Sequence, residues 1–599
     1  MNETHITAKT AGTLDGLFRE RVKLTPQLTA YKHYDRQQEG WCDTTWYEMG
    51  QMVARWQTAL RQEDLQEGDR VGLILSNSRE WIAYEQAALG LGLVVVPFYV
   101  DDRPDNIAYI INDAGVEVML LESDKQLKSL LPLFDQLEDV KRFIILNAKN
   151  EELNNDDDRA VLAKNWLPEM GDGLHERGGD PHQMATIVYT SGTTGRPKGV
   201  MLSHHNILFV ADIGIKTVKI IGEHTFVSFL PLSHMLERTG GYILPLMIGA
   251  TVAFARSVQQ LAVDIETIKP TALISVPRIY ERIYEKLNNQ LQKKSFIARG
   301  LFKLTTNIGW HRFEYQQGRK RWSPILLLWP ILYRLVARKL HERLGGRLQF
   351  AVTGGAALPP TVAKVFIGLG INLLQGYGLT ETSPLLTVNA PFKNQPYSVG
   401  VIPEGITLKI GENDELLAKG AGIMLGYWNN HQATSEMIDN DGWLHTGDKA
   451  RIEGDFVFIT GRIKDIIVMS NGEKIPPVDM ENAIALDPAI EQALIAGEGK
   501  AYLSAIVVLN GEEWVTLAKE SELDPFNKEN LNNKKIQSIL LKRIKDALKD
   551  FPGYAKIRRV TAVLEPWTIE SELLTPTLKI KRAKVIDKFE AEIESMYSE

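Results

Sequence analysis

The feature that most constrains this chain is a loop rich in glycine and hydroxyl side chains directly after an apolar run. Residues 185–189, Ala-Thr-Ile-Val-Tyr, predict a buried strand. The loop that follows, 190–199, reads Thr-Ser-Gly-Thr-Thr-Gly-Arg-Pro-Lys-Gly. Glycines let the backbone approach a bulky ligand, hydroxyls donate hydrogen bonds, and Arg196 and Lys198 add positive charge. The loop predicts a polyphosphate cradle; the alternative is a solvated turn.

The order of these residues excludes two common nucleotide loops. A Walker A loop has a second glycine five residues after the first, and its lysine precedes Ser or Thr. Here Pro197 stands five residues after Gly192, and Gly199 follows Lys198. No Gly-x-Gly-x-x-Gly segment opens a helix, so a dinucleotide fingerprint is missing as well.

The stretch YTSGTTGRPKGVMLSH at 189–204 resembles the signature loop of the adenylate-forming enzymes. This superfamily includes acyl-CoA synthetases, peptide-synthetase adenylation domains and beetle luciferases. Further matching stretches follow in the expected order, at 230–234, 354–356, 375–381, 446–448, 461–465 and 574–579. The resemblance spans roughly residues 12–590, and LPLSHMLER and LTPTLKIKR are most similar to the long-chain fatty acyl-CoA synthetases.

Composition narrows the class of protein. With 599 residues the chain has room for about four domain-sized units, and 44% hydrophobic and 24% charged residues are typical of a globular enzyme. The net charge of −7 argues against nucleic acid as a partner. A single cysteine, Cys42, excludes an internal disulfide framework. Neither a secretory signal nor an apolar run of about 18 residues is visible, so we expect a cytoplasmic protein.

Alternating strands and helices predict an α/β fold with doubly wound sheets. Residues 69–75 and 94–97 read as buried strands around a helix at 80–91, and strand patterns recur at 118–121 and 143–146. Strands separated by helices of this length favour a parallel sheet.

The later chain changes character twice. Short strands and glycine turns predict a small β-barrel subdomain at about 392–461. Beyond it, 462–599 shows an α+β pattern that includes a helix at 534–549 and an exposed-looking loop around Lys579. We expect an N-terminal domain, 1–461, that binds ATP and the acyl group, and a smaller mobile C-terminal domain, 462–599.

Two predicted strands end in small residues, which suits a flat base lying against backbone. One strand ends at Gly354, Gly355 and Ala356; the next leads into Gln375, Gly376, Tyr377, Gly378, Leu379, Thr380 and Glu381. The carboxyl ends of parallel strands are where such sheets bind ligands. We expect Tyr377 to stack on adenine, Thr380 to bond a phosphate or acyl oxygen, and Glu381 to hold Mg²⁺.

Two further sites are predicted on polar residues. The carboxylate of Asp448 can accept both ribose hydroxyls, with Arg462 donating from the other side; the alternative is ordinary turn chemistry. His234 follows Ser233, but no Gly-x-Ser-x-Gly elbow supports a hydrolase. The resemblance implies that His234 lies where the carboxylate substrate meets the nucleotide. The alternative is a histidine with only a structural, hydrogen-bonding role.

The resemblance also implies roles residue by residue. The catalytic set is Lys579, Thr193, Glu381 and His234, with Mg²⁺ on Glu381 and Thr193 and the interdomain hinge at Lys464. The nucleotide-binding set adds Thr190, Ser191, Gly192, Thr194, Gly195 and Lys198 to the adenine and ribose residues above. The implied ligands are ATP, Mg²⁺, a fatty acid and coenzyme A.

We therefore predict an AMP-forming long-chain fatty acid:CoA ligase. Cys42 is remote in sequence from every motif, so the acyl acceptor is expected to be an external thiol. The alternatives are a fatty acyl-AMP ligase that loads a carrier protein and a non-catalytic nucleotide- or lipid-binding relative. The oligomeric state is left open, with a homodimer as one alternative.

Residues 283–346 form the least orderly stretch of the sequence. Between Arg319 and Arg343, seven Lys or Arg and one acid, Glu342, surround the apolar run 325–333. Basic residues beside aliphatic and aromatic ones suit an anionic lipid surface. The alternative is a helical hairpin packed on the enzyme with its charges in solvent.

Overall fold

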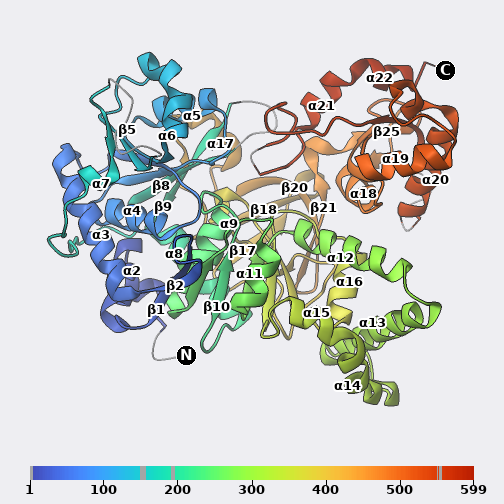
Figure 1. Ribbon diagram of the computed structural model, residues 1–599, viewed down its shortest axis with the longest axis horizontal. Coiled ribbons are helices and arrows are strands. Elements are labelled where there is room, and N and C mark those ends of the chain that lie inside the picture. The colour runs from blue at the N-terminus through green and yellow to red at the C-terminus, as the bar shows by residue number, and fades with distance from the viewer. Residues whose placement is uncertain are drawn as a thin grey trace.

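A computed structural model describes residues 5–148, 157–190, 196–549, 551, 556–575 and 577–598. It confirms a mixed α/β molecule with two large sheets and a smaller C-terminal domain (Figure 1). The first sheet has eight strands in the spatial order β19 (Gly426–Tyr427), β9 (Lys198–Ser203), β8 (Met184–Thr190), β4 (Val94–Pro97), β3 (Arg70–Ile74), β5 (Val116–Ser123), β6 (Arg142–Asn147) and β7 (Ala160–Leu162).

Helices on both faces of this sheet follow from the sequence pattern. β4 and β3 are parallel neighbours linked by α4 (Arg79–Gly90), while α5 (Pro104–Ala114) and α6 (Asp124–Leu130) share the core on one face. The other face packs with α2 (Leu14–Leu24), α3 (Trp46–Leu60), α4 and α8 (His204–Val218). Ser203 caps α8 through a reciprocal bond with Asn206, as the serine before the apolar run predicts.

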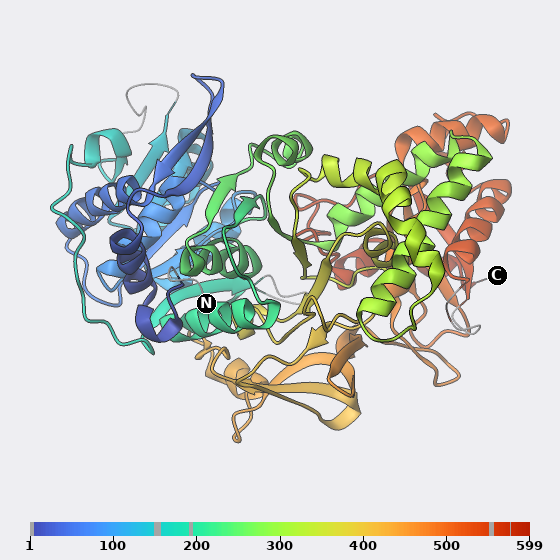
Figure 2. The same cartoon turned by 90° about the horizontal axis from the view of Figure 1, so that it is seen from below.

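The second sheet has thirteen strands and carries both the parallel and the antiparallel parts of the chain. Its spatial order is β17 (Ile406–Ile410), β18 (Glu415–Gly420), β20 (Leu444–Glu453), β21 (Phe456–Arg462), β16 (Gly400–Val401), β15 (Thr387–Val388), β14 (Leu373–Tyr377), β13 (Phe350–Thr353), β12 (Ala272–Ser275), β10 (Thr225–Ser228), β11 (Thr251–Phe254), β1 (Thr29–Asp35) and β2 (Gly40–Thr45). The antiparallel strands form the protruding unit in Figure 2 and join the parallel strands through β15.

The stretch that looks least orderly in sequence is largely helical. It holds α12 (Pro277–Gln292), α13 (Phe296–Gln316), α14 (Trp329–Leu332) and α15 (Arg338–Arg343), with α13 against α16 (Pro360–Gly368). Its pattern is hard to recognise because Pro324 and Pro330 divide it into short turns and because many of its apolar side chains face solvent.

The C-terminal domain has its own core. A ribbon of β22 (Ile467–Val468) and β23 (Lys474–Ile475) precedes α18 (Pro477–Ile484). A three-stranded sheet of β24 (Ile490–Ala496), β25 (Leu503–Leu509) and β26 (Ile557–Val563) packs with α19 (Gly511–Glu520), α20 (Lys534–Ala547), α21 (Arg582–Lys588) and α22 (Glu590–Ser595). The apolar face of α20, with Ile536, Leu540 and Ile544, lies in this core as its periodicity predicts.

Candidate functional site

The ends of the phosphate loop are fixed by a pair of strands. Thr190, the last residue of β8, lies opposite Lys198, the first residue of β9. Residues 191–195, and with them the predicted contacts of Ser191, Gly192, Thr193, Thr194 and Gly195, lie outside the described residues. The Nζ atom of Lys198 is 5.1 Å from the ring centre of Tyr427 in β19, so the loop's lysine points toward that strand.

Tyr427 also contacts the residue predicted to hold a metal. Its hydroxyl donates to Oε1 of Glu381 at 2.7 Å, which brings Glu381 to the same tyrosine as Lys198. No cluster of three or more His, Cys, Asp or Glu suited to a metal occurs among the described residues. Because Mg²⁺ commonly binds through one or two carboxylates plus substrate phosphates, a single glutamate fits a phosphate-bound ion and not an all-protein cage.

The small-residue edge of the sheet contains buried polar atoms without partners. Thr353, the last residue of β13, pairs in register with Gln375 of β14, and neither Thr353 Oγ1 nor Gln375 Oε1 has a hydrogen-bond partner among the described residues. Gly355 and Ala356 beside them are exposed, and Gly355 has a φ of +81°. Orphaned buried oxygens next to an open backbone edge fit a polar flat ligand such as adenine.

Packing requires a glycine at position 378 and leaves little room for a side chain at Gly376. A Cβ on Gly378 would lie 1.9 Å from the carbonyl oxygen of Pro384, and one on Gly376 would lie 3.3 Å from that of Thr387. A side chain at Gly378 would therefore displace backbone, whatever ligand lies nearby.

Asp448 is held from two sides. Its Oδ2 accepts from the Tyr377 hydroxyl at 2.6 Å, and its Oδ1 accepts from Nε of Arg462 at 2.9 Å. Asp448 and Arg462 face each other across β20 and β21. Burial and the Asp448 carboxylate raise the pKa of Tyr377 well above its usual range, so the phenol stays protonated and continues to donate.

His234 is a neutral ring at the start of a short helix, α9 (Met235–Glu237). Its Nδ1 accepts from the backbone N–H of Leu236 at 3.2 Å, which places the ring proton on Nε2. Burial, with a smaller effect from the positive charge of Lys579, lowers the pKa of His234 to about 4. The ring therefore offers one N–H donor near Lys579 at neutral pH.

The charge of Lys579 interacts with those of Arg462, Asp448 and Glu381, although Lys579 belongs to the C-terminal domain. Desolvation lowers its pKa, Arg462 lowers it further, and Asp448 and Glu381 oppose the shift. The loop around it was predicted to be exposed. In the structure Leu578 and Lys579 are exposed, as predicted, while Leu574 and Thr575 are buried. Thr575 and Lys579 exchange hydrogen bonds of 2.8 and 3.0 Å across a tight hairpin.

The comparisons with known proteins decide the family. Residues 18–428 match the model described as AMP-binding enzyme, and 464–599 match the AMP-binding enzyme C-terminal domain. The chain belongs to the AMP-binding enzyme family. Similar relatives are the long-chain-fatty-acid–CoA ligase FadD15 of Mycobacterium bovis, 29% identical over 95% of this chain and 94% of that protein, and the human long-chain-fatty-acid–CoA ligase ACSBG1, 30% identical over 89% and 78%.

Solved structures share the fold of this AMP-binding enzyme. The adenylation domain of a carboxylate reductase from Mycobacterium chelonae superposes with a TM-score of 0.77 at 20% identity, covering 98% of this chain and 91% of that one. The anthranilate CoA ligase AuaEII, in complex with anthranoyl-AMP, gives 0.73 at 18% identity and 99% of both chains.

The predicted hinge residue lies between the two parts of this AMP-binding enzyme. Lys464 is exposed in the single 3₁₀ turn Ile463–Asp465, after β21 and before β22. The turn directly follows Arg462, whose Nε donates to Asp448.

Tyr427 and Glu237 were not predicted from the sequence. Tyr427 reaches Glu381 only because β19 pairs with β9. Glu237 is fully buried, and neither of its carboxyl oxygens has a hydrogen-bond partner among the described residues. Burial raises the pKa of Glu237 to about 8, and the more distant Ser228 hydroxyl offsets only part of this shift. A charged Glu-Arg pair inside an apolar segment was the signal available for Glu237.

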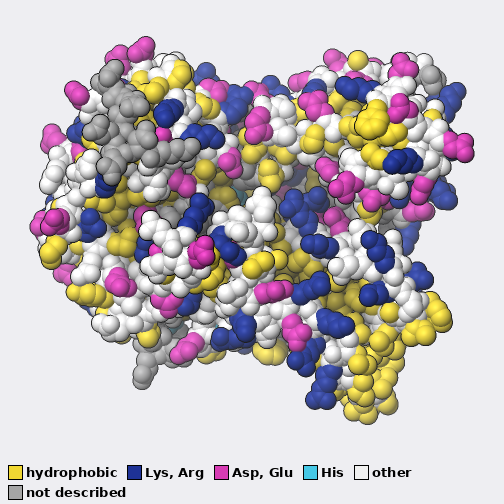
Figure 3. Space-filling model, viewed as in Figure 1, with side chains coloured by type: hydrophobic (Ala, Val, Ile, Leu, Met, Phe, Trp, Pro, Cys, Tyr) yellow, Lys and Arg dark blue, Asp and Glu magenta, His cyan; other side chains and the backbone are white. Residues whose placement is uncertain are grey.

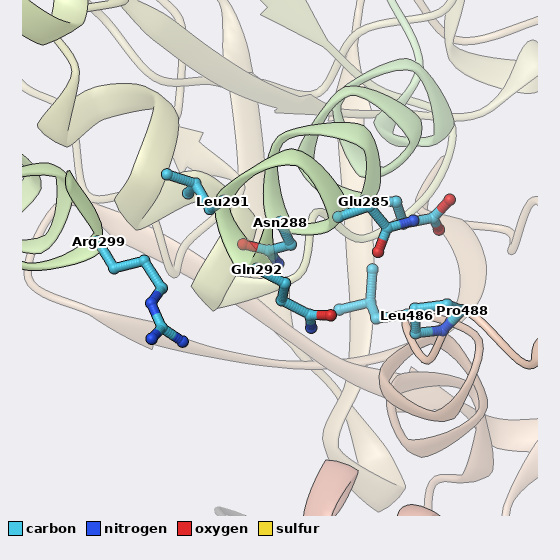
Figure 4. Close-up of a pocket in the computed structure, with 8 residues that line it drawn as sticks. Glu285, Asn288, Leu291, Gln292, Arg299, Leu486 and Pro488 are labelled. Carbon is cyan, nitrogen blue, oxygen red and sulfur yellow. The ribbon is translucent and has the colours of Figure 1, made fainter. Parts of the chain in front are cut away.

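The cavity in Figure 4 is separate from this cluster. It has a volume of about 290 Å³ and lies where α12 meets the turn at Leu486 and Pro488 of the C-terminal domain. Glu285, Asn288, Gln292 and Arg299 line it, and none of the predicted site residues does.

Proposed function

We propose that this AMP-binding enzyme is a long-chain fatty acid:CoA ligase (AMP-forming), which activates a fatty acid with ATP and transfers the acyl group to coenzyme A. The observation that carries the proposal is that Lys579 of the C-terminal domain interacts electrostatically with Glu381, Asp448 and Arg462 of the predicted nucleotide site. The names of the curated relatives, long-chain-fatty-acid–CoA ligases similar over most of the chain, support the substrate class.

The first half-reaction requires a carboxylate anion to attack the α-phosphate of a polyanion. Lys198 and Lys579 are the cations assigned to lower this repulsion, and Glu381 with Thr193 would hold Mg²⁺, which screens phosphate charge when bound. A charge-assisted bond contributes about 1.5 to 3 kcal/mol to such a site. The products are acyl-adenylate and pyrophosphate.

The other residues position the nucleotide and the acid. Asp448 and Arg462 are assigned to the ribose, and Tyr377 with Gln375 and the edge at Gly354, Gly355 and Ala356 to adenine. Thr190 and Thr380 are assigned to phosphate or acyl oxygens. The Nε2–H of His234 is a suitable donor to the acyl carboxylate, because Leu236 fixes its tautomer.

In the second half-reaction a thiol displaces AMP. The only cysteine, Cys42, lies on β2 at the outer edge of the thirteen-stranded sheet, where β14 and its site are six strands away in the spatial order. An external thiol such as that of coenzyme A is therefore the proposed acceptor. We assign residues 1–461 to ATP and acyl binding, and 462–599 to a domain that turns about Lys464 between the two steps.

Acid-dependent pyrophosphate–ATP exchange, followed by AMP release with and without coenzyme A, tests this proposal. Exchange with AMP release only on addition of coenzyme A is expected. Release that requires a carrier protein would favour an acyl-AMP ligase, and no exchange would favour a non-catalytic relative.

A series of fatty acids of different chain length tests the substrate class. At about 0.8 kcal/mol per buried methylene, two more carbons should tighten binding of the acid roughly tenfold. A maximum with acetate or an aromatic acid would overturn the long-chain assignment.

A second proposal concerns location: a cytoplasmic enzyme that attaches to an anionic membrane through the surface at Arg319–Arg343. Trp322, Leu327 and Ile331 are 54%, 69% and 58% exposed. Figure 3 shows an apolar surface beside basic side chains at the lower right, where Figure 1 labels α14. None of the described helices is long and apolar enough to span a bilayer. Exposed apolar side chains flanked by cations fit shallow insertion among acidic headgroups.

A further inference from the structure

The two arms of the hairpin that carries Lys579 are joined by backbone hydrogen bonds. Leu574 bridges Ile580, the backbone N–H of Lys581 donates to the carbonyl of Leu573 at 2.8 Å, and that of Thr575 donates to Lys579 at 2.8 Å. Glu572 stands directly before this ladder, with a left-handed φ of +62°. Because the two arms are paired, restraining the side chain of Glu572 also restrains the position of Lys579.

Glu572 contacts the N-terminal domain through Arg103. Arg103, the N-cap of α5, forms an ion pair with Glu572 and a second one with Asp105 in the first turn of its own helix. The side chains of Arg103 and Glu572 are 31% and 43% exposed, so the pair is at the surface but not fully solvated.

The helix behind Arg103 is itself fixed to the phosphate side of the site. Arg196, just after the undescribed part of the loop, lies 5.0 Å from the ring centre of Tyr109 in α5. The carbonyl of Asp113, also in α5, accepts from Trp428 beside Tyr427 at 2.8 Å. Arg103 therefore belongs to a helix, α5, that also contacts Arg196 of the phosphate loop and Trp428 next to β19.

The other arm of the hairpin faces the same helix cap. Lys581 has a lowered pKa because of desolvation first and the charge of Arg103 second, while Asp102 opposes the shift. Lys584 approaches Glu572 at 3.9 Å from within the C-terminal domain. Glu572 thus lies between Lys584 of its own domain and Arg103 of the other.

We propose that Arg103 and Glu572 are positioning residues, an interdomain ion pair that holds the Lys579 hairpin in place for adenylation and separates when the thiol attacks. The inference rests on the proposed two-step function. Because the pair connects the domains only while Lys579 is in the site, its loss raises the free energy of that arrangement alone. The first half-reaction slows, and the second, which does not use Lys579, keeps its rate.

The test compares Arg103→Gln, Glu572→Gln and the double variant in both half-reactions. Exposed ion pairs contribute little, so each single variant is expected to slow pyrophosphate–ATP exchange about two- to fivefold. The double variant should be no slower than the worse single variant, and thioester formation from preformed acyl-adenylate should be unchanged. The charge exchange Arg103→Glu with Glu572→Arg should recover part of the exchange rate. Asp105→Asn, which removes only the pair within α5, is the matched control and should not slow exchange.

Equal slowing of both half-reactions, additive losses in the double variant, or no loss in either single variant would overturn the inference. Thermal unfolding of each variant shows whether a slower rate comes from a folding defect. The charge-exchange variant is a second check, because it recovers the exchange rate only if the pair acts across the interface. Failure of the proposed function gives a different result, because the unaltered protein would then show no acid-dependent exchange.

Discussion

The hydroxyl of Tyr377 donates to Asp448 at 2.6 Å, and this bond fixes the orientation of the carboxylate assigned to the ribose. A carboxylate accepts about four hydrogen bonds. With Tyr377 on one oxygen and Arg462 on the other, each oxygen keeps capacity for a ribose hydroxyl. The site is therefore oriented before the nucleotide enters.

Tyr377→Phe should raise the KM for ATP by about three- to tenfold with a smaller change in kcat. The variant keeps the ring but loses one hydrogen bond, worth about 0.5 to 1.5 kcal/mol. Steady-state kinetics at saturating acid and coenzyme A measure the effect, with Tyr397→Phe, a half-exposed tyrosine, as the control. An unchanged KM would mean that Asp448 does not need Tyr377 to bind the nucleotide.

Glu237 should make stability depend on pH. Its pKa is about 8 when folded and 4.5 in the reference state, so the folded protein holds the extra proton between these values. The free energy of unfolding contributed by this group is highest below about pH 4.5 and falls as the pH rises toward 8, by at most about 5 kcal/mol.

Glu237→Gln removes this titration. Urea unfolding at pH 5.5, 7 and 8.5 should show the variant gaining stability relative to the unaltered protein as the pH rises. Glu520→Gln, at an exposed position, should show no such trend. A difference that is constant with pH would mean that Glu237 is ionised in the folded protein.

Local structure could be predicted from the sequence wherever one segment determines it. The strand Val94–Pro97 has the predicted bounds, and Ser203 caps α8, because β-branched runs and capping serines act within a few residues. Contacts between distant segments could not be predicted. Tyr427 meets Glu381 through strand pairing, and the packing of Gly378 on Pro384 depends on how a later turn folds back. Arg103 and Glu572 are 469 residues apart in the chain.

The membrane proposal predicts salt-sensitive binding to anionic vesicles. Arg319 bonds Glu314 at 2.9 Å, so Lys320 and Arg321 are the better positions for charge reversal. Lys320→Glu with Arg321→Glu, or Leu327→Ser with Ile331→Ser, should each reduce co-sedimentation with vesicles of anionic lipid severalfold. Reversal of Lys128 and Lys164, basic residues outside this surface, is the control. Unchanged sedimentation of both test variants would exclude this surface as the anchor.

Lys464→Pro should separate the two steps. Proline fixes φ near roughly −65°, so a turn that must change its backbone angles would be trapped in one state. Thioester formation should slow far more than adenylation, with the melting temperature little changed. Lys464→Ala, which keeps the backbone free, should leave both rates near normal. Proportionate slowing of both steps in the proline variant, or of neither, would place the hinge elsewhere.

The most direct test of the assigned site is Lys579→Ala, measured separately in the two half-reactions. Because Lys579 is the charge that the C-terminal domain brings to Asp448 and Glu381, its removal should abolish acid-dependent pyrophosphate–ATP exchange. Thioester formation from preformed acyl-adenylate and coenzyme A should continue at a rate close to that of the unaltered enzyme. Equal loss of both half-reactions, or exchange that survives without the lysine, would contradict the account.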